Sequence, residues 1–506
     1  MNIAQWIDSH AQHTPEKTAI HFEGENISYV ELSRRVGQSA ALMTERWGLR
    51  HGDRVAVLAA NHPEQVVVLF ACAQIGAIFV PLNWRLAEPE LQHILNDCEP
   101  TVLLHDRHYE SLAQSLVASL SARCTAVPIE SQGSLAEQRL GVLPQKLTRP
   151  SSFADSDLLI VYTSGTTGSP KGAVLGQGAL RCNARMAQHA YDMRSTDVIL
   201  NFLPLFHVGG MNIQMTPALA CGATVVLKPK FDPADVLHAI ERHQVSLTNS
   251  VPTILQALVE HEMWSQIDKR SLRVVSIGST DVPTQLIEAV HASGIPVIQI
   301  YGATETSPIA MYQRPEMAYE TVGAIGYAGL GCSVRLVDET GQDVAVEEHG
   351  EIWVSGENVL QRYWNNPEAT DLALVDGWFR TGDVARRDAR GLFWFSDRLK
   401  HVVISGGENI YPAEIERLLR VQPGVREVAV VGHAHPRWGE VPVAVVVRED
   451  ASITEQSLLA CFEGELARFK HPRHVIFCEA LPRNAMAKVI LADVQQLVMA
   501  ELDKLR

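Results

Sequence analysis

The sequence predicts an α/β fold, because short apolar runs rich in β-branched residues alternate with amphipathic, helix-like stretches. The strand-like runs occupy residues 54–60, 101–105, 158–162, 223–227, 273–278 and 296–301. Helix-like segments at 232–244 and 283–294 separate some of these runs, and the second ends at a glycine, as helices often do. Such alternation is typical of mostly parallel sheets with helices on both faces.

The pattern changes in the last third of the chain. After about residue 330, short strands and turns such as VRLVDETGQDV predict an antiparallel or barrel-like part. Beyond Arg398, a helix at 412–420 and strand-like runs at 425–433 and 442–449 predict a compact α+β unit. This last segment carries 14 basic and 14 acidic residues, whereas residues 1–397 carry 29 and 44. The change in charge balance favours a domain boundary near residue 398.

Size and composition limit the class of protein. A chain of 506 residues with 46% hydrophobic and 20% charged residues is typical of a soluble protein with two or more domains. The net charge of -15 argues against a dedicated nucleic-acid binder, because such proteins carry surplus lysine and arginine. The eight cysteines are scattered without a CxxC pair, which favours reduced thiols in a cytoplasmic protein.

Targeting and membrane segments are not expected. The N-terminal residues MNIAQWIDSH include an acid and lack the apolar core of a secretory signal. The most apolar stretch, residues 66–82, holds Gln74 and Gly76 and runs into Pro81. We therefore expect it to be a buried helix leading into a buried strand, without a transmembrane span.

The segment YTSGTTGSPKG, residues 162–172, follows a strand-like run and is rich in glycine and hydroxyl side chains. Its glycines allow backbone N–H groups to converge on an anion, and Lys171 adds a positive charge. It is not a P-loop, because Pro170 precedes the lysine, Gly172 replaces the magnesium-binding Ser or Thr, and a strand-like GAVL follows. The segment predicts a phosphate-binding loop of another kind, with a surface hairpin as the alternative.

A second candidate site is YGATETSP, residues 301–308, at the end of a strand-like run. Glu305 is suited to Mg²⁺, which needs few protein carboxylates when nucleotide phosphates complete its coordination. Thr304 could donate a hydrogen bond to a phosphate, and Tyr301 could lie against a base. An N-capped turn around Thr304 is the structural alternative.

The third and fourth candidates lie towards the C-terminus. Asp383 follows a Thr-Gly turn and could accept both hydroxyl groups of a ribose. Arg398 and Lys400 stand where the charge balance changes, and Gly406–Gly407 leaves room for a thin ligand close to the backbone. Lys488 lies in a loop before the last predicted helix. Each also has a simpler interpretation, as a turn aspartate, a solvated cation or a loop glycine.

The joint occurrence of these motifs resembles the adenylate-forming superfamily of acyl-CoA synthetases, adenylation domains and luciferases. The resemblance covers YTSGTTGSPKG, YGATE, the TGD at 381–383, DRLK at 397–400 and the late lysine, and it extends from about Pro15 to Ile490. It implies a large N-terminal domain of two α/β sheets plus a small β-barrel, and a mobile α+β C-terminal domain. The implied parts are residues 1–397, a hinge at 398–400 with Lys400 as pivot, and residues 401–506.

The resemblance also implies a reaction in two halves. A carboxylate attacks the α-phosphate of ATP to give an acyl adenylate and pyrophosphate, and the thiol of coenzyme A then displaces AMP. Phosphoryl chemistry of this kind depends on positioning and charge neutralisation. The implied substrates are ATP, CoA and a small carboxylic acid, with Mg²⁺ as cofactor.

The same resemblance assigns roles to individual residues. Lys488 would bridge the carboxylate and the α-phosphate, and Gly407 would line a tunnel for the pantetheine arm of CoA. Thr304 would meet the α-phosphate, Glu305 the Mg²⁺, Asp383 the ribose, and Arg398 the nucleotide from the hinge side. The β and γ phosphates would be held by Thr163, Ser164, Gly165, Thr166, Thr167, Gly168 and Lys171. Arg468, Lys470 and Arg473 could meet CoA phosphates, although a solvated loop is the preferred interpretation.

Two positions depart from the family pattern. Ala487 stands before the late lysine, where glycine is usual, and Asp281 occupies a small-residue position in the turn GSTDVP at 278–283. The second departure puts details of adenine or acyl contact in doubt. Gly278 and Gly302 are assigned to the substrate side.

The segment PLFHVGGMN, residues 204–212, bears on the choice of acid. It resembles the segment whose histidine gates the acyl pocket of CoA ligases, so His207 is the gate candidate, with a core histidine as the alternative. The next four residues carry no charge, which favours an apolar acyl group over a dicarboxylate. NHPE, FACAQIGAIFVPLN and SGGENIYPAEIE resemble feruloyl-CoA and related aryl or medium-chain acyl-CoA synthetases. An aromatic acid and a fatty acid both remain open.

Three other functions are weighed against a stand-alone acyl-CoA synthetase. An adenylation enzyme that loads a carrier protein is disfavoured, because no carrier domain is expected and the amino-group-binding aspartate is absent near PLFH. A luciferase-like oxygenase is disfavoured, because the C-terminal KLR is not the peroxisomal signal SKL seen in that group. A non-catalytic nucleotide-binding protein is disfavoured by Thr304, Glu305 and Lys488. The sequence leaves the oligomeric state open, with a homodimer as one option.

Overall fold

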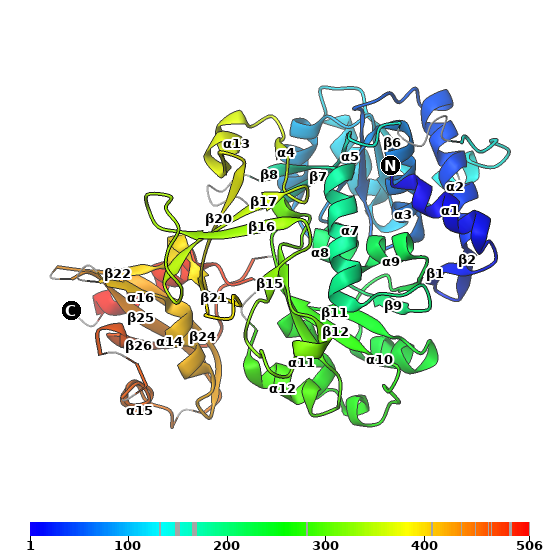
Figure 1. Cartoon of the computed structure of the whole chain (residues 1–506). Helices are drawn as coiled ribbons and strands as arrows, with labels where there is room; N and C mark the ends of the chain where they lie inside the picture. The colour runs from blue at the N-terminus through cyan, green and yellow to red at the C-terminus, as the bar shows by residue number, and fades with distance from the viewer. Residues whose placement is uncertain are drawn as a thin grey trace. The chain divides into compact units, whose positions relative to one another are not determined.

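The apolar runs form two large, mainly parallel sheets in the computed structural model, which confirms the α/β class (Figure 1). The structure describes residues 1–130, 133–146, 152–163, 170–279, 282–405, 408–436, 438–450, 452–463, 465–466, 468–484 and 488–504. Within them, the chain divides into two units, one of residues 1–334 and 354–380 and the other of residues 335–353 and 381–506.

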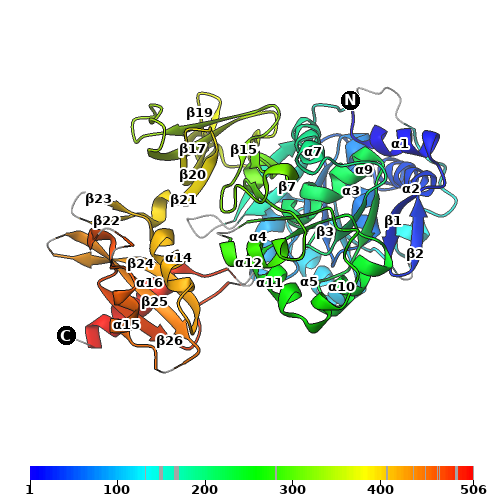
Figure 2. The ribbon, with the colours of Figure 1, turned by 60° about the horizontal axis from the view of Figure 1, so that its bottom comes forward.

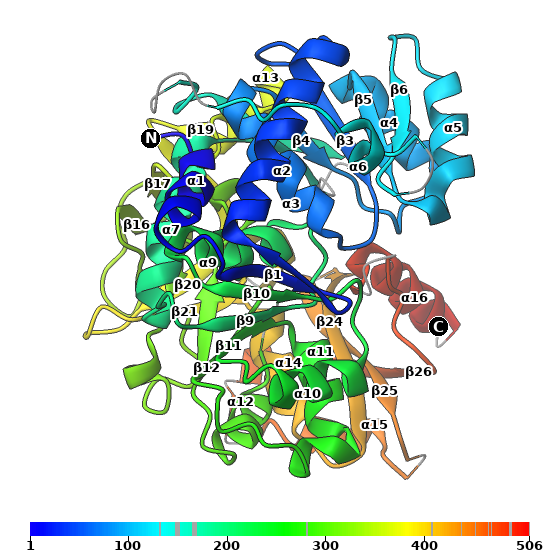
Figure 3. The ribbon, with the colours of Figure 1, turned by 90° about the vertical axis from the view of Figure 1, so that its right-hand side faces the viewer.

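The first unit contains a nine-stranded sheet whose central strands are parallel (Figure 3). Its order is β15 (Tyr327–Ala328), β14 (Met311–Tyr312), β13 (Val297–Tyr301), β12 (Val274–Gly278), β11 (Leu247–Ser250), β9 (Val198–Asn201), β10 (Thr224–Leu227), β1 (Thr18–Phe22) and β2 (Glu25–Ser28). Strands β2, β14 and β15 at the edges pair antiparallel. The parallel strands end together, which makes one edge of the sheet a place for ligands.

A seven-stranded sheet forms the other half of this unit. Its order is β18 (Arg362–Tyr363), β8 (Lys171–Gly176), β7 (Asp157–Thr163), β4 (Ile78–Pro81), β3 (Arg54–Leu58), β5 (Val102–His105) and β6 (Thr125–Pro128). The strands from β7 to β6 are parallel, and β8 and β18 pair antiparallel. Strand β8 runs antiparallel to β7 because it returns directly after the glycine-rich loop.

Helices cover both faces of each sheet. The nine-stranded sheet packs against α10 (Pro233–Arg242), α11 (Pro252–Glu260) and α12 (Thr284–His291), and the seven-stranded sheet against α4 (Glu88–Cys98) and α5 (Glu110–Ala118). A shared layer holds α1 (Ala4–His13), α2 (Tyr29–Ala41), α3 (Pro63–Ile75), α7 (Gln177–Tyr191) and α9 (Thr216–Cys221). Because α3 and α7 contact the seven-stranded sheet and α9 the nine-stranded sheet, this layer lies between the sheets.

Local sequence explains where these helices begin and end. Helix α10 starts after Asp232, whose carboxylate accepts the N–H of Asp235 at 2.9 Å, and Pro233 supplies the first helical residue. Helix α3 begins at Pro63 and stops at Gly76, which has the left-handed conformation with φ of 75°. All of α3 is buried, and β4 follows it, so the expected buried helix and strand at 66–82 are confirmed.

A third sheet carries the chain from one unit to the other. It consists of β16 (Cys332–Val337), β17 (His349–Gly356), β20 (Trp378–Arg387), β19 (Leu374–Val375) and β21 (Phe393–Arg398). Strands β16, β17 and β20 each begin in one unit and end in the other. Strand β20 pairs antiparallel with β19 and β21, which matches the antiparallel part expected after residue 330.

The second unit ends in an α+β fold (Figure 2). Its sheet has the order β23 (Glu408–Ile410), β22 (Val403–Ser405), β25 (Gly439–Arg448) and β24 (Val425–His435), with β26 (His474–Cys478) beside β25. Helices α14 (Pro412–Arg420) and α16 (Leu491–Lys504) pack on β24, and α15 (Glu455–Ala460) packs on β26. Two apolar clusters fill the two faces of this sheet, as expected for a compact unit.

The remaining helices are short. They are η1 (Leu42–Arg46), η2 (Arg107–Tyr109), α6 (Leu135–Gln138), α8 (Val208–Gly210), η3 (Met211–Met215), η4 (Glu262–Ser265), η5 (Thr304–Thr306), η6 (Pro315–Met317), α13 (Pro367–Ala373), η7 (Leu399–His401) and η8 (Arg468–Lys470). Within the described ranges, no helix is both long enough and apolar enough to cross a membrane.

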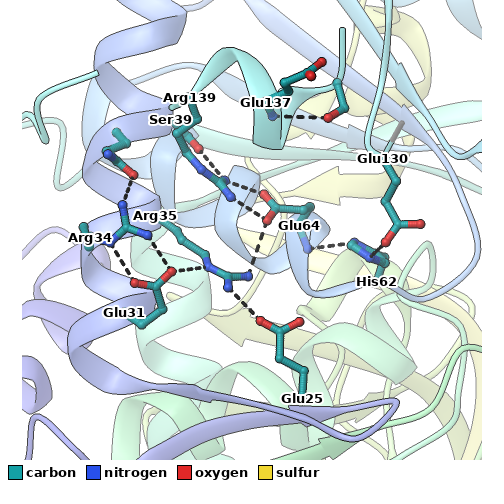
Figure 4. Close-up of polar contacts among 12 residues, drawn as sticks. Glu25, Glu31, Arg34, Arg35, Ser39, His62, Glu64, Glu130, Glu137 and Arg139 are labelled. Atoms are coloured by element: carbon teal, nitrogen blue, oxygen red, sulfur yellow. Dashed lines mark hydrogen bonds and ion pairs between the residues drawn. The ribbon is translucent and has the colours of Figure 1, made fainter. Parts of the chain in front are cut away.

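A buried ion pair joins the start of α3 to the end of α6 (Figure 4). The guanidinium of Arg139 donates to both carboxylate oxygens of Glu64, at 2.5 and 2.8 Å, and to the hydroxyl of Ser39 at 3.2 Å. Arg35 lies 3.7 Å from the same carboxylate and also contacts Glu31. The side chains of Glu64 and Arg139 are almost inaccessible to water, so their charges compensate each other.

Candidate active site

The flanks of the glycine-rich loop form a hairpin. Strands β7 and β8 pair antiparallel with Thr163 opposite Lys171. The hydroxyl of Tyr162 donates to the Asp97 carboxylate at 2.5 Å, which fixes the end of β7. The candidates Ser164, Gly165, Thr166, Thr167 and Gly168 lie outside the described residues. Because a strand follows the loop, the structure confirms that this is not a P-loop, in which a helix would follow.

Glu305 lies in the short turn η5, directly after the carboxyl end of β13. The N–H of Ala303 donates to the hydroxyl of Thr306 at 2.9 Å and closes the turn, whose N-cap residue Ala303 has no side-chain oxygen to cap it. This turn leaves Tyr301, Thr304 and Glu305 partly exposed at the edge where parallel strands end. A turn around Thr304 is thus present, without a side-chain N-cap, and it is compatible with a nucleotide-binding role.

Two glycines at this edge are required by backbone packing. A Cβ atom at Gly302 would lie 1.7 Å from the carbonyl oxygen of Pro308. At Gly278 it would lie 2.3 Å from the carbonyl oxygen of Ile300 on the neighbouring strand. Close approach of main chains thus accounts for both glycines, and their assignment to the substrate side stays a prediction.

One aromatic residue connects the loop and the acidic turn, and sequence reasoning missed it. The hydroxyl of Tyr363 donates to Oε1 of Glu305 at 2.8 Å. The ammonium of Lys171 lies 5.6 Å from the centre of the same ring. The structure therefore brings Lys171 and Glu305 to one side chain. The sequence did not predict a role for Tyr363, because its strand is only two residues long and shows no recognisable pattern.

Asp383 and Arg398 face each other in the second unit. They are paired residues on β20 and β21, and Nε of Arg398 lies 3.1 Å from Oδ1 of Asp383. Asp383 is 6% exposed, and its N–H donates to the hydroxyl of Thr381 at 3.0 Å. The preceding Gly382 has a φ of +68°, and its N–H donates to Glu351. The expected nucleotide contacts Asp383 and Arg398 are thus adjacent.

The expected hinge lies in the same unit. Asp397 is buried, and its carboxylate accepts the N–H of Arg398 at 2.7 Å and of Ala413 at 2.9 Å. Because Ala413 is in the first turn of α14, this carboxylate caps that helix. Lys400 belongs to η7, and its side chain lies outside the described residues. The boundary near residue 398 and the role of Lys400 stay predictions.

Lys488 is joined to Asn484 by two hydrogen bonds near the C-terminus. Its N–H donates to Oδ1 of Asn484 at 3.0 Å, and its carbonyl oxygen accepts the N–H of Asn484 at 2.9 Å. The side chain is exposed, as both the catalytic role and the solvated-lysine alternative require. Gly407, Asp281 and Ala487 lie outside the described residues. In the basic cluster, Lys470 pairs with Glu414 at 2.6 Å.

His207 lies among aromatic rings in the first unit. Its imidazole is 4.5 Å from the ring of Phe206, and the Arg85 guanidinium lies 4.7 Å from Trp84 and 5.7 Å from Phe206. Burial, and secondarily the charge of Arg85, lowers the pKa of His207 to about 4. The imidazole is therefore neutral at pH 7. Sequence reasoning did not mark Arg85 or Trp84.

A chain of hydrogen bonds links the segment after His207 to the nine-stranded sheet. The Asn249 amide donates to the carbonyl of Gly209 at 3.4 Å, and Asn249 accepts from Ser276 at 2.7 Å. Ser276 in turn accepts from the hydroxyl of Tyr191 at 2.6 Å. A Cβ atom added at Gly209 would meet no atom within 4 Å, so there is space beside this residue. The uncharged segment therefore borders open space close to the carboxyl ends of β11 and β12.

The lowered pKa of His207 leads to a stability prediction. Its pKa is about 4 in the folded protein and about 6.5 unfolded, so the unfolded chain binds more protons between these values. The stabilisation of the folded protein that results from this difference in pKa is present above pH 6.5 and is lost as the pH falls towards 4. We expect the drop in urea midpoint between pH 7 and pH 5 to be smaller in His207→Gln. Equal drops in both proteins would contradict the lowered pKa.

The donor groups fit a magnesium ion that arrives with nucleotide. Among the described residues, no group of three or more His, Cys, Asp and Glu side chains could hold a metal ion by itself. Glu305 offers one partly exposed carboxylate at the edge of the sheet. A hard cation whose other ligands are phosphate oxygens and water needs little more from the protein.

Comparison with known proteins decides the family. The family described as "AMP-binding enzyme" matches residues 7–364, and its C-terminal domain matches residues 414–488. The chain belongs to the AMP-binding enzyme family. Indoleacetate–CoA ligase of Aromatoleum aromaticum is 46% identical over 98% of both chains. Feruloyl-CoA synthase of an Amycolatopsis species is 41% identical over 98% of both chains.

Solved structures of AMP-binding enzymes agree with the fold. ATP-bound MatB from Rhodopseudomonas palustris has a TM-score of 0.89 and 33% identity, over 98% of this chain and 99% of that one. The o-succinylbenzoate CoA synthetase of Bacillus subtilis, in complex with its acyl-adenylate intermediate, has a TM-score of 0.85 and 31% identity, over 97% of both chains. These matches confirm the expected fold and the acid–CoA ligase class, and they do not favour the carrier-loading alternative.

Proposed function

We propose that this enzyme activates an aromatic carboxylic acid with ATP and transfers the acyl group to CoA. The observation that carries the choice of acid is the neutral His207, packed on an aromatic ring at the start of an uncharged segment. A charged second carboxylate would lose part of its hydration among these rings, whereas an aromatic ring would not. Relatives that are named for indoleacetate and ferulate support the same choice.

The residues take the roles that the motifs implied. Lys171 and the loop before it hold the β and γ phosphates, and Thr304 contacts the α-phosphate. Glu305 holds Mg²⁺, which supplies positive charge against the phosphates when bound. Asp383 and Arg398 bind the nucleotide, Lys488 neutralises charge as the adenylate forms, and Gly407 admits the pantetheine arm of CoA. The paired positions of Asp383 and Arg398 support their assignment.

Pyrophosphate release over a panel of acids tests this function. The panel contains indole-3-acetate, ferulate, 2-succinylbenzoate, malonate and decanoate, with indole-3-acetamide as a control without a carboxylate. We expect the aromatic monocarboxylates to give the highest kcat/KM, and thioester to form only when CoA is added. Adenylate without thioester would exclude CoA as the acceptor, and preference for decanoate or malonate would contradict the aromatic acid.

The proposal also covers the cellular compartment and the oligomeric state. All eight cysteines are free thiols, which is typical of a reducing compartment, and we assign the enzyme to the cytoplasm. A homodimer stays a prediction that light scattering of the purified protein can check.

A further inference from the structure

Tyr363 is anchored to the strand that follows the glycine-rich loop. Its strand β18 pairs antiparallel with β8, and Tyr363 lies opposite Ala173. The next N–H, of Trp364, donates to the carbonyl of Gly172 at 2.7 Å. Tyr363 is 8% exposed, so its ring has little freedom to move. The phenol is thereby fixed to the main chain one and two residues beyond Lys171.

The same segment also holds the acidic turn, through main chain and side chain together. The N–H of Leu360 donates to the carbonyl of Glu305 at 2.7 Å, and the hydroxyl of Tyr363 donates to Oε1 of Glu305 at 2.8 Å. The phenol is the donor in this hydrogen bond, because an ionised carboxylate can only accept. A carboxylate held in this way keeps one orientation before a cation arrives.

The ring of Tyr363 makes a third contact. The Lys171 ammonium lies 5.6 Å from its centre, within the range of a cation–π interaction. One side chain thus contacts the cation at the end of the phosphate loop with its face and the carboxylate of the acidic turn with its hydroxyl. Neither contact depends on the relative placement of the two units, because all these residues belong to the first unit.

We propose that Tyr363 is a positioning residue that orients Glu305 towards the magnesium–nucleotide complex and aligns it with Lys171. The inference rests on the proposed function, because it assigns Glu305 to Mg²⁺. Groups that orient a metal ligand are commonly worth roughly tenfold to a hundredfold in metal affinity or activity. Tyr363 acts through Glu305 and does not touch the reacting atoms.

Tyr363→Phe separates the two contacts, because it removes the hydroxyl and keeps the ring beside Lys171. We expect the Mg²⁺ concentration for half-maximal pyrophosphate release to rise about tenfold to a hundredfold. At saturating Mg²⁺ the KM for the acid should stay at the wild-type value. The rate of thioester formation from supplied acyl adenylate should also stay unchanged, since that half-reaction does not use Mg²⁺. A loss caused by misfolding would reduce both half-reactions together and would overturn the assignment.

Calorimetric titration of ATP into the enzyme without acid gives a second readout that does not depend on turnover. In the wild type, ATP should bind more tightly as the Mg²⁺ concentration is raised. In Tyr363→Phe, this gain in ATP affinity should require higher Mg²⁺ concentrations. If the wild-type enzyme releases no pyrophosphate with any acid, the proposed function fails, while this titration still decides the role of Tyr363. Identical titrations for wild type and Tyr363→Phe would overturn the proposal.

Tyr29→Phe is the matched control. Tyr29 is also a buried tyrosine of the first unit, and its hydroxyl donates to the carbonyl of Ala223 at 2.7 Å. Its removal takes away one comparable hydrogen bond that involves no residue of the site. We expect Tyr29→Phe to keep the wild-type Mg²⁺ dependence. A shift in Tyr29→Phe equal to that in Tyr363→Phe would show a general loss of stability and would contradict the positioning role.

Discussion

Replacement of Lys488 by alanine should reduce acid-dependent pyrophosphate release by about 10²- to 10³-fold, the usual effect of removing one group that stabilises charge in a transition state. The lysine is exposed, and two hydrogen bonds join it to Asn484. These bonds involve the main chain of residue 488, so the substitution leaves them in place. The measurement is the rate of pyrophosphate release with saturating acid and ATP.

The second half-reaction distinguishes a catalytic lysine from a structural one. Thioester formation from supplied acyl adenylate should keep its wild-type rate in Lys488→Ala, because the adenylate already contains the bond that Lys488 helps to form. Lys504→Ala is a control in the same unit, since Lys504 is also exposed and pairs with Glu501 in the last helix. It should leave both half-reactions unchanged. Equal loss of both steps in Lys488→Ala would contradict the proposed role.

The sequence predicted the strands of the parallel sheets closely, because each combines an apolar run with a nearby turn signal. The runs at 158–162 and 273–278 correspond to β7 (Asp157–Thr163) and β12 (Val274–Gly278). Helix α10 was predictable for a local reason, the Asp-Pro pair at its start. Elements fixed by contacts over a few residues are therefore visible in the sequence alone.

Long-range pairing was not predictable in the same way. Strand β18 is two residues long and joins β8, which lies almost two hundred residues earlier, so no periodicity marks it. Residues 335–353 group with the C-terminal part of the chain, and nothing in their local pattern indicates this. Such features depend on which main chains meet, and Tyr363 was missed for this reason.

In the candidate site, too, local features were predictable and long-range contacts were not. Motifs identified Glu305, Asp383 and Lys171, because their residue types match the chemistry of phosphate, ribose and metal binding. The residues that orient these side chains are not part of any recognisable motif. Tyr363 illustrates this, since its hydroxyl donates to the carboxylate of Glu305, a contact that sequence spacing does not reveal.

The largest expected effect on stability comes from the buried pair in Figure 4. Arg139→Met should lower the free energy of unfolding of the first unit by about 3–5 kcal/mol, because it leaves the Glu64 carboxylate buried without its main partner. Arg35 lies 3.7 Å from that carboxylate and compensates part of the loss, which favours the lower end of the range. The measurement is urea-induced unfolding at pH 7, followed through the transition of the first unit.

A double variant and a surface control make this prediction specific. In Glu64→Met/Arg139→Met both charges are gone, and apolar side chains of similar size fill the site, so the double variant should be more stable than Arg139→Met. Arg185→Met removes an ion pair with Glu357 in which both side chains are more than 60% exposed, and it should change stability by no more than about 1 kcal/mol. If the losses in free energy of unfolding caused by the two single substitutions add up in the double variant, the two buried charges do not stabilise each other. Stability would then come from the packing of these side chains, and the pair would be no more sensitive than any other buried contact between α3 and α6.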